Sequence, residues 1–299
     1  MKFEPVQQEI PQVKSLLKKR TREAKPVSKK TQRRIVVLVF AFTVLVSAGF
    51  WLKTEVPKYW QTITEPVIIS TLPKEQQFDP SPVLKEIESL TQDLRGAYGV
   101  YVYELKTGRE YGVRQNEVFP AASLMKLPVM LLVYQEAEKG NLKLNDYREL
   151  VKVMGQRSDN AAYNRLVKYF SKEKIQALIE SLGMGKTTII KDDTAPADIG
   201  LFFKKLYQGN LVNRAHQEEW LGFLTDTIFE DRIPAGIPEN IRVAHKIGTE
   251  MGTFSDAGII FSKNPFILVI MSKNARENEA TDVLPKVTKA VWEWEEQGR

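Results

Sequence analysis

Three short groups of polar residues, far apart in the sequence, have the types needed for nucleophilic catalysis. Ser123 and Lys126 lie three residues apart in an apolar stretch, residues 119–137, whose composition is typical of a buried helix. Residues at that spacing share a helix face, so a lysine of lowered pKa could take the serine proton. A helix N-terminus would also favour negative charge on the oxygen. The pair alone is weak evidence for catalysis, because a serine also precedes a lysine by three residues at Ser15 and at Ser171.

The second and third groups supply the remaining functions that such a reaction needs. Ser158 and Asn160 lie at the edge of a helical stretch, and Lys246, Gly248 and Thr249 follow in a segment that leads toward the next strand. The hydroxyl of Ser158 can pass a proton to a leaving nitrogen with support from Lys246, which also offers positive charge to a substrate carboxylate. Asn160 has donor and acceptor atoms for a lysine and a substrate amide. Each residue alone could be a helix cap or a solvated charge. The hypothesis of nucleophilic catalysis therefore rests on the order of the three groups along the chain.

The elements that must position these groups are predicted from the spacing of apolar residues. Strands at both ends of the domain with helices between them indicate a sheet completed by distant segments, plus an inserted helical region. The serine helix should end near residues 139–140. Strands are predicted at residues 99–105, 257–262 and 266–271, with a short return strand at Tyr111 and Val113, and helices at residues 82–95, 145–170, 173–182, 196–207, 214–225 and 280–297.

The order Ser-x-x-Lys, Ser-Asp-Asn and Lys-Ile-Gly-Thr resembles that of class A β-lactamases and their penicillin-binding relatives. The resemblance covers roughly residues 83–299 and includes the Ile-Pro-Ala-Gly-Ile-Pro and Asp-Ala-Gly-Ile-Ile segments around the third motif. It implies an α+β fold with an antiparallel sheet, flanking terminal helices, an inserted all-helical subdomain and no cofactor. It also implies catalysis by Ser123, Lys126, Ser158, Asn160 and Lys246, substrate binding by Gly248 and Thr249, and an oxyanion hole from the backbone N–H groups of Ser123 and Thr249.

The sequence departs from the family pattern around the same site. Ile247 replaces the usual hydroxyl residue of the third motif, and Ala257 replaces an arginine that many relatives carry. The loop at residues 186–194 is short and lacks the glutamate that activates the deacylating water in class A enzymes. Its carboxylates are Asp192 and Asp193, of which Asp193 better matches a structural aspartate. The segment between the first two motifs is also short, so we expect a more open site with doubtful deacylation.

Three functions remain open on these grounds. The first is a membrane-anchored serine hydrolase that opens a β-lactam or a related cell-wall amide through an acyl-enzyme on Ser123. The second is a penicillin-binding D,D-peptidase-like enzyme, and the third is a non-turnover module that binds β-lactams or peptidoglycan stem peptides as a sensor or scaffold. The missing loop glutamate favours the second or third, whereas the overall resemblance favours the first.

Composition narrows the possible partners. The chain of 299 residues has no cysteine, which excludes a disulfide framework and a thiol nucleophile, and its two histidines argue against a zinc site. Residues 1–34 hold 11 Lys or Arg against three Glu, so their net charge is +8. The rest of the chain carries −2, which gives the whole chain its net charge of +6. The basic tail lacks interleaved aromatic residues, so we expect no nucleic-acid partner and no metal.

A membrane anchor is predicted directly after that tail. Residues 35–52 are 18 residues without a charge, which span roughly 27 Å as a helix and just cross a bilayer core. The basic flank places residues 1–34 in the cytoplasm and residues 83–299, the hydrolase domain, outside the cell membrane. Residues 53–82 hold five prolines and are predicted to be an extended stalk. A signal peptide cleaved near residues 46–48 is the alternative.

Overall fold

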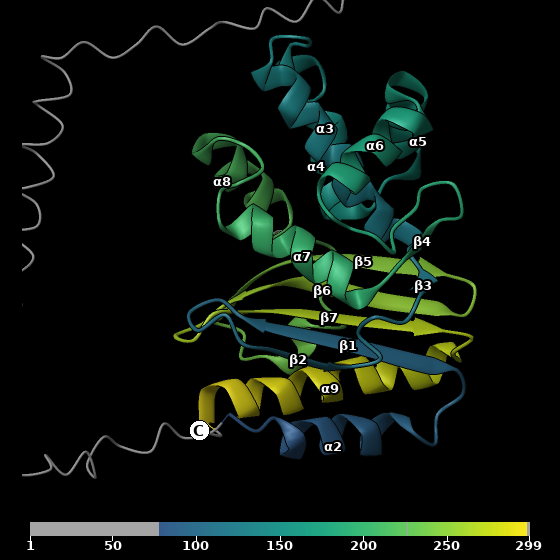
Figure 1. Ribbon diagram of the computed structural model, residues 1–299, viewed down its shortest axis with the longest axis vertical. Coiled ribbons are helices and arrows are strands. Elements are labelled where there is room, and N and C mark those ends of the chain that lie inside the picture. The colour runs from purple at the N-terminus through teal and green to yellow at the C-terminus, as the bar shows by residue number, and fades with distance from the viewer. Residues whose placement is uncertain (1–77, 226, 298–299) are drawn as a thin grey trace, which may run out of the picture. The chain divides into compact units, whose positions relative to one another are not determined.

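The computed structural model describes residues 78–225 and 227–297, and their central feature is a five-stranded antiparallel sheet (Figure 1). The strand order is β2-β1-β7-β6-β5, so strands from the two ends of the domain lie side by side. This arrangement confirms the predicted α+β fold with its antiparallel sheet. The strands are β1 (Ala97–Glu104), β2 (Glu110–Val113), β5 (Arg242–Glu250), β6 (Thr253–Phe261) and β7 (Phe266–Lys273).

Two helices from opposite ends of the domain cover one face of the sheet (Figure 1). They are α2 (Ser81–Thr91) and α9 (Glu277–Gln297), and they also contact each other. Successive strand residues point to opposite faces, so every second side chain, such as Val100 and Ile270, joins the core beneath these helices. Ile87 of α2 is fully buried in the same core. The terminal segments therefore build the layer that supports the sheet from behind.

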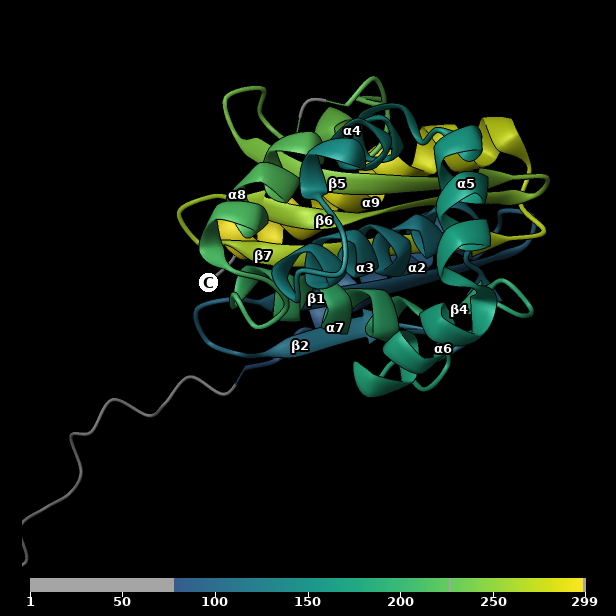
Figure 2. The ribbon, with the colours of Figure 1, turned by 90° about the horizontal axis from the view of Figure 1, so that it is seen from above.

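The helical region between β2 and β5 covers the other face (Figures 1 and 2). Within it, α7 (Pro196–Tyr207) packs directly against β1, β6 and β7. The remaining helices stand on this layer and share its apolar core. They are α3 (Lys126–Glu138), α4 (Arg148–Arg157), α5 (Asn160–Phe170), α6 (Lys172–Ser181) and α8 (Arg214–Phe223), with the short 3-10 helices η2 (Ala122–Met125) and η3 (Leu144–Asp146). A third 3-10 helix, η4 (Pro234–Gly236), instead contacts α9.

Gly200 allows α7 to approach the sheet closely. A Cβ at this position would lie 2.1 Å from Cε1 of Tyr101, which is far inside van der Waals contact. We expect Gly200→Ala to lower the free energy of unfolding by about 1–3 kcal/mol through overpacking, although alanine is the better helix former. Gly222→Ala in α8, where a Cβ meets no atom within 4 Å, should raise it instead. Thermal unfolding measures both, and a Gly200→Ala protein as stable as wild type would refute the close contact.

Two elements around the predicted site differ from expectation. The helix predicted over residues 145–170 is two helices, because Ser158 adopts a left-handed backbone with φ of 55° between α4 and α5. Asp159 then begins α5 by accepting a hydrogen bond of 2.6 Å from the backbone N–H of Ala162. The segment that was expected to lead toward a strand is itself β5. Its His245 and Lys246 interrupt the apolar pattern that marks a buried strand.

The predicted tail at residues 1–34, the predicted membrane span at residues 35–52 and most of the predicted stalk lie outside the described residues. They therefore stay predictions. The end of the predicted stalk, residues 81–82, belongs to the first turn of α2. Among residues 78–225 and 227–297, no helix has both the length and the apolar character needed to cross a bilayer.

Candidate active site

Ser123 is held in a short turn between two anchored segments. It lies in η2, after β3 (Phe119–Pro120) and before α3, rather than inside the long helix that the sequence predicted. β3 pairs with β4 (Asp193–Thr194), and the backbone N–H of Ala121 donates to the carbonyl oxygen of Asp192 at 2.7 Å. These backbone contacts fix the serine at the start of α3, where the helix N-terminus favours negative charge.

Lys126 connects the first two groups of predicted residues. Its Nζ donates to Oγ of Ser123 at 2.6 Å and to Oδ1 of Asn160 at 2.8 Å. Burial lowers the pKa of Lys126 to about 8, although the charges of Asp192 and Asp159 oppose the shift. A fraction of the amine is therefore neutral near pH 7 and able to accept the proton of Ser123.

Lys246 connects the second and third groups. Its Nζ donates to Oγ of Ser158 at 2.8 Å and to the carbonyl oxygen of Ile247 at 2.9 Å. Burial, with the charge of Lys126 nearby, holds the pKa of Lys246 well below its usual range, while Asp256 opposes the shift. The left-handed turn at Ser158 is what brings its hydroxyl from the end of α4 to β5.

Gly248 and Thr249 form the part of β5 next to the serine turn. A Cβ at Gly248 would lie 3.1 Å from the carbonyl oxygen of Ala121, so glycine permits the close approach of β5 and η2. Thr249 is exposed at this end of the strand, and its Oγ1 accepts a hydrogen bond from Arg232. The structure thus joins Ser123, Lys126 and Asn160 in one hydrogen-bonded group and Ser158 and Lys246 in a second. Gly248 and Thr249 follow Lys246 on β5, next to the serine turn.

Arg232 is a cation of this region that the sequence analysis missed. It is only 6% exposed, and its Nη1 donates to the carbonyl oxygens of Gly248 at 3.2 Å and Ser255 at 2.7 Å. Its Nη2 donates to Oγ1 of Thr249 at 2.7 Å, whereas its Nε has no hydrogen-bond partner in the described part of the chain. No described carboxylate lies within ion-pair distance of it. Its position just before the Ile-Pro-Ala-Gly segment was the only available signal in the sequence.

Asp192 was noted in the sequence without a role, and the structure gives it an unusual environment. It is half-buried and has a positive φ of 56°. Burial raises the pKa of Asp192 to about 6, the charges of Glu250 and Asp193 add to the shift, and Lys126 opposes it. The ring centroid of Tyr163 lies 5.3 Å from Nζ of Lys126. Burial raises the pKa of Tyr163, and the charge of Asp192 adds to this shift. A carboxylate with a pKa shifted upward therefore lies close to a lysine with a pKa shifted downward.

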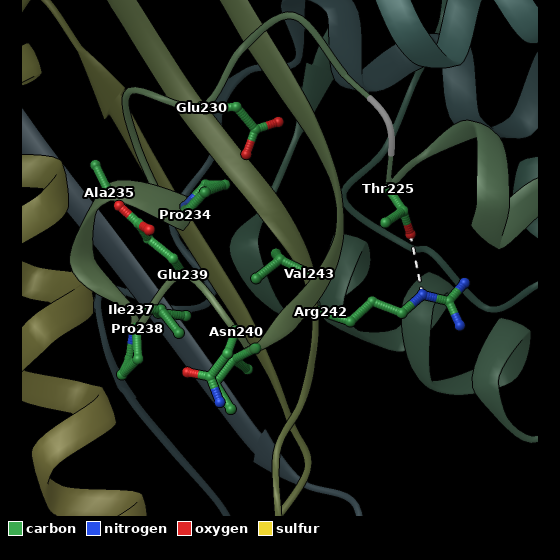
Figure 3. Close-up of a pocket in the computed structure, with 11 residues that line it drawn as sticks. Thr225, Glu230, Pro234, Ala235, Ile237, Pro238, Glu239, Asn240, Arg242 and Val243 are labelled. Carbon is green, nitrogen blue, oxygen red and sulfur yellow. Dashed lines mark hydrogen bonds between the residues drawn. The ribbon is translucent and has the colours of Figure 1, made fainter.

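A large open cleft lies away from this constellation. It has a volume of about 790 Å³ and lies between the outer part of β5 and the segment before it, where Nε of Arg242 donates to Oγ1 of Thr225 at 3.2 Å (Figure 3). None of the predicted site residues lines it. The described residues also contain no group of three or more His, Asp or Glu that could hold a metal ion.

Comparisons with known proteins agree with this fold. The sequence pattern of the beta-lactamase enzyme family matches residues 82–147 and 146–294. An imipenem-hydrolyzing beta-lactamase of Enterobacter cloacae is 25% identical over 246 residues, which are 67% of this chain and 84% of that relative. A solved mutant of PBP-A, an acyl-enzyme complex with penicillin G, has a TM-score of 0.67 at 20% identity and 71% and 96% coverage. The beta-lactamase of Sphaerobacter thermophilus has a TM-score of 0.66 at 21% identity, over 72% of this chain and 97% of that one.

The fold and the family match define a class A β-lactamase-like serine hydrolase. With most of residues 78–297 covered by the family pattern, the chain belongs to the beta-lactamase enzyme family.

Proposed function

We propose that this protein opens a β-lactam ring, or a related cell-wall amide, through an acyl-enzyme on Ser123. The observation that carries the proposal is the hydrogen bond of 2.6 Å between Ser123 and Lys126, whose pKa is lowered to about 8 by burial. A serine becomes a nucleophile when such a base removes its proton. The beta-lactamase relatives and the penicillin acyl-enzyme of PBP-A support this choice of substrate class.

The acylation step uses the two hydrogen-bonded groups in turn. Lys126 takes the proton of Ser123 as Oγ forms a bond to the carbonyl carbon, and the backbone N–H groups of Ser123 and Thr249 stabilise the oxyanion. The C–N bond then breaks while Ser158 gives its proton to the nitrogen. Lys246, which donates to Oγ of Ser158 at 2.8 Å, can restore that proton. Asn160 holds Lys126 and a substrate amide.

An anionic substrate suits the charges at the Thr249 end of the site. Arg232 carries a guanidinium group suited to a carboxylate, and no described carboxylate lies within ion-pair distance of it. Lys246 gains charge when a substrate carboxylate arrives beside it, because an opposite charge raises the pKa of an amine. We therefore infer a substrate that carries a carboxylate, as β-lactams and peptidoglycan stem peptides both do.

Release of the acyl group requires an activated water, and we assign its activation to Asp192. The chain lacks the loop glutamate of class A enzymes, but Asp192 is half-buried and interacts electrostatically with Lys126. A carboxylate with a pKa of about 6 can take a proton from water near neutral pH. As Asp192 takes that proton, the water oxygen bonds to the ester carbon. The bond from this carbon to Oγ of Ser123 then breaks, and Lys126 returns the serine proton to Oγ. The proton held by Asp192 passes by way of Lys126 to Lys246, which restores the starting charges.

Intact-mass measurement of the full-length protein, kept in detergent and mixed with penicillin G, tests the proposal over time. A gain of the drug's mass followed by its loss supports a hydrolase. A lasting adduct would favour the sensor or scaffold, and release of terminal D-alanine from a stem peptide would favour the D,D-peptidase-like enzyme. No gain of mass with either compound would contradict the whole proposal.

We also propose that the hydrolase domain faces outward from a single-pass anchor at residues 35–52, since a cell-wall substrate lies outside the membrane. The chain has no cysteine, so Met251→Cys, at a fully exposed position, introduces a single thiol. A membrane-impermeant maleimide should label this variant in intact cells as fully as in lysed cells. Labelling only after lysis would place the domain inside and contradict the predicted topology.

A further inference from the structure

A buried histidine, His245, lies on β5 beside Lys246, with its side chain on the other face of the sheet. It is 1% exposed, and its Nδ1 lies 2.8 Å from Oδ1 and 3.0 Å from Oδ2 of Asp256, which is fully buried on β6. Asp256 also accepts a hydrogen bond from its neighbour's backbone, Ala257 N–H, at 2.9 Å.

The His245–Asp256 pair fastens the segment of residues 227–233, which we call the strap. Nε2 of His245 lies 3.1 Å from Oγ1 of Thr227 and 3.9 Å from Oε1 of Glu230. At the other end of the strap, the backbone N–H of Ile233 donates to Oδ2 of Asp256 at 3.0 Å. Both ends of the strap are therefore attached to the same buried pair.

The strap carries Arg232, the cation beside Thr249 that has no ion-pair partner among the described residues. Because Arg232 directly precedes Ile233, the bond from Ile233 to Asp256 sets where the arginine leaves the backbone. From there its guanidinium reaches the carbonyl oxygens of Gly248 and Ser255 and the hydroxyl of Thr249. A chain of contacts thus runs from the buried pair on one face of the sheet to the substrate-binding end of β5.

We propose that His245 and Asp256 are positioning residues, which hold the strap behind β5 and thereby keep Arg232 in place to recognise the anionic group of the substrate. The inference rests on the proposed function, because that group is a substrate carboxylate. Neither residue touches substrate. Their effect should appear in the recognition of charge rather than in the chemistry of Ser123.

The charges around His245 support its pairing role. Burial alone would lower its pKa, but the charge and hydrogen bonds of Asp256, with Glu230, raise the pKa of His245 to about 9. The charged groups that face it are Asp256 from β6 and Glu230 from the strap, while Lys246 lies on the opposite face of its own strand. Glu230 also lines the open cleft of Figure 3, so the strap has solvent on its outer side.

Nuclear magnetic resonance can test the pair directly, since the chain has only two histidines. In full-length protein with labelled imidazole nitrogens, one ring should stay protonated well above pH 7 and titrate near pH 9. Asp256→Asn should lower the pKa of that ring, because the charge of Asp256 is lost and only Glu230 then opposes the effect of burial. Assignment comes from His245→Gln. Two rings that both titrate near 6.5 in the wild type would overturn the pairing.

The link to substrate recognition needs a comparison of two acyl donors, penicillin G and its methyl ester, which lacks the carboxylate. Arg232→Gln should slow acylation by the free acid roughly tenfold or more, since the variant loses a charge-assisted hydrogen bond to the carboxylate. His245→Gln and Asp256→Asn should give the same selective loss, with little change for the ester. His216→Gln is the matched control, because His216 pairs with Glu138 at α8.

The outcomes of this comparison test the positioning role and the proposed hydrolase function. Equal slowing of both donors in His245→Gln and Asp256→Asn would show a general structural defect and overturn the positioning role, as would no slowing of either. If the wild type is acylated by neither donor, the proposed hydrolase function fails. The positioning pair is then judged by equilibrium binding of penicillin G, followed by protein fluorescence, in the same variants. No binding by the wild type would overturn the positioning role as well.

Discussion

Full-length protein with Ser123→Ala should gain no mass from penicillin G at any time, whereas the wild type gains the mass of the drug. The variant keeps Lys126, Asn160 and the fold, but it lacks the oxygen that forms the ester. The expected loss is complete rather than partial, because no acyl-enzyme can exist without the nucleophile. Intact-mass spectrometry after short and long incubation measures the effect.

The chain supplies a matched control at Ser171, which also precedes a lysine by three residues. In the structure Ser171 begins α6, where its Oγ accepts a hydrogen bond of 3.4 Å from the backbone N–H of Lys174. Ser171→Ala should therefore be acylated at the wild-type rate. Modification of Ser123→Ala as fast as the wild type would place the nucleophile elsewhere and refute the proposed site.

The contrast between these two serines explains which part of the site could be predicted from the sequence. Ser123, Ser158 and Lys246 belong to short motifs, and their order along the chain is visible without a structure. Neither the hydrogen bond from Lys126 to Asn160 nor that from Lys246 to Ser158 follows from spacing, since α5 and β5 are brought to the serine turn by the fold. Motif order identified the participants, and tertiary packing supplies their contacts.

Arg232 and His245 show why the rest of the site could not be assigned from the sequence. Neither lies in a motif, and an isolated arginine or histidine has many structural explanations. Their importance depends on the register of β5 against β6, which places Ile247 opposite Asp256 and Gly248 opposite Ser255. A sequence with no alignment does not give that register. The strand β5 was not predicted either. Its buried polar residues, His245 and Lys246, find their hydrogen-bond partners only in the folded protein.

The second large effect is expected at Asp192, where Asp192→Asn should turn a transient acyl-enzyme into a lasting one. Asparagine keeps the shape of the side chain and removes its ability to accept a proton from water. General-base catalysis contributes about 10²–10⁴ in rate, so release of the penicilloyl group should slow by roughly 100-fold or more. Acylation should change little, since Lys126 keeps its bonds to Ser123 and Asn160.

The pH dependence of release gives an independent measure of the same group. Because the pKa of Asp192 is about 6, its basic carboxylate form is populated above pH 6 and lost below it. Release in the wild type should therefore fall as the pH drops through about 6, and this limb should be absent from the slow residual release of Asp192→Asn. Single-turnover measurements from pH 5 to 8 follow the decay of the adduct directly, separate from its formation.

Asp193→Asn is the control that separates a catalytic carboxylate from a merely nearby one. Asp193 adjoins Asp192 in sequence, but its backbone pairs with β3 and with Thr188. If Asp192 activates the water, Asp193→Asn should release the acyl group at close to the wild-type rate at neutral pH. It should also keep the limb, moved to lower pH, because the charge of Asp193 contributes to the raised pKa of Asp192. If both variants release it equally fast, the water is activated by another base, and Lys126 becomes the better candidate because it already contacts the oxygen that leaves. Acylation of Ser123 would stand in either case, so the two steps of the proposed reaction can fail separately.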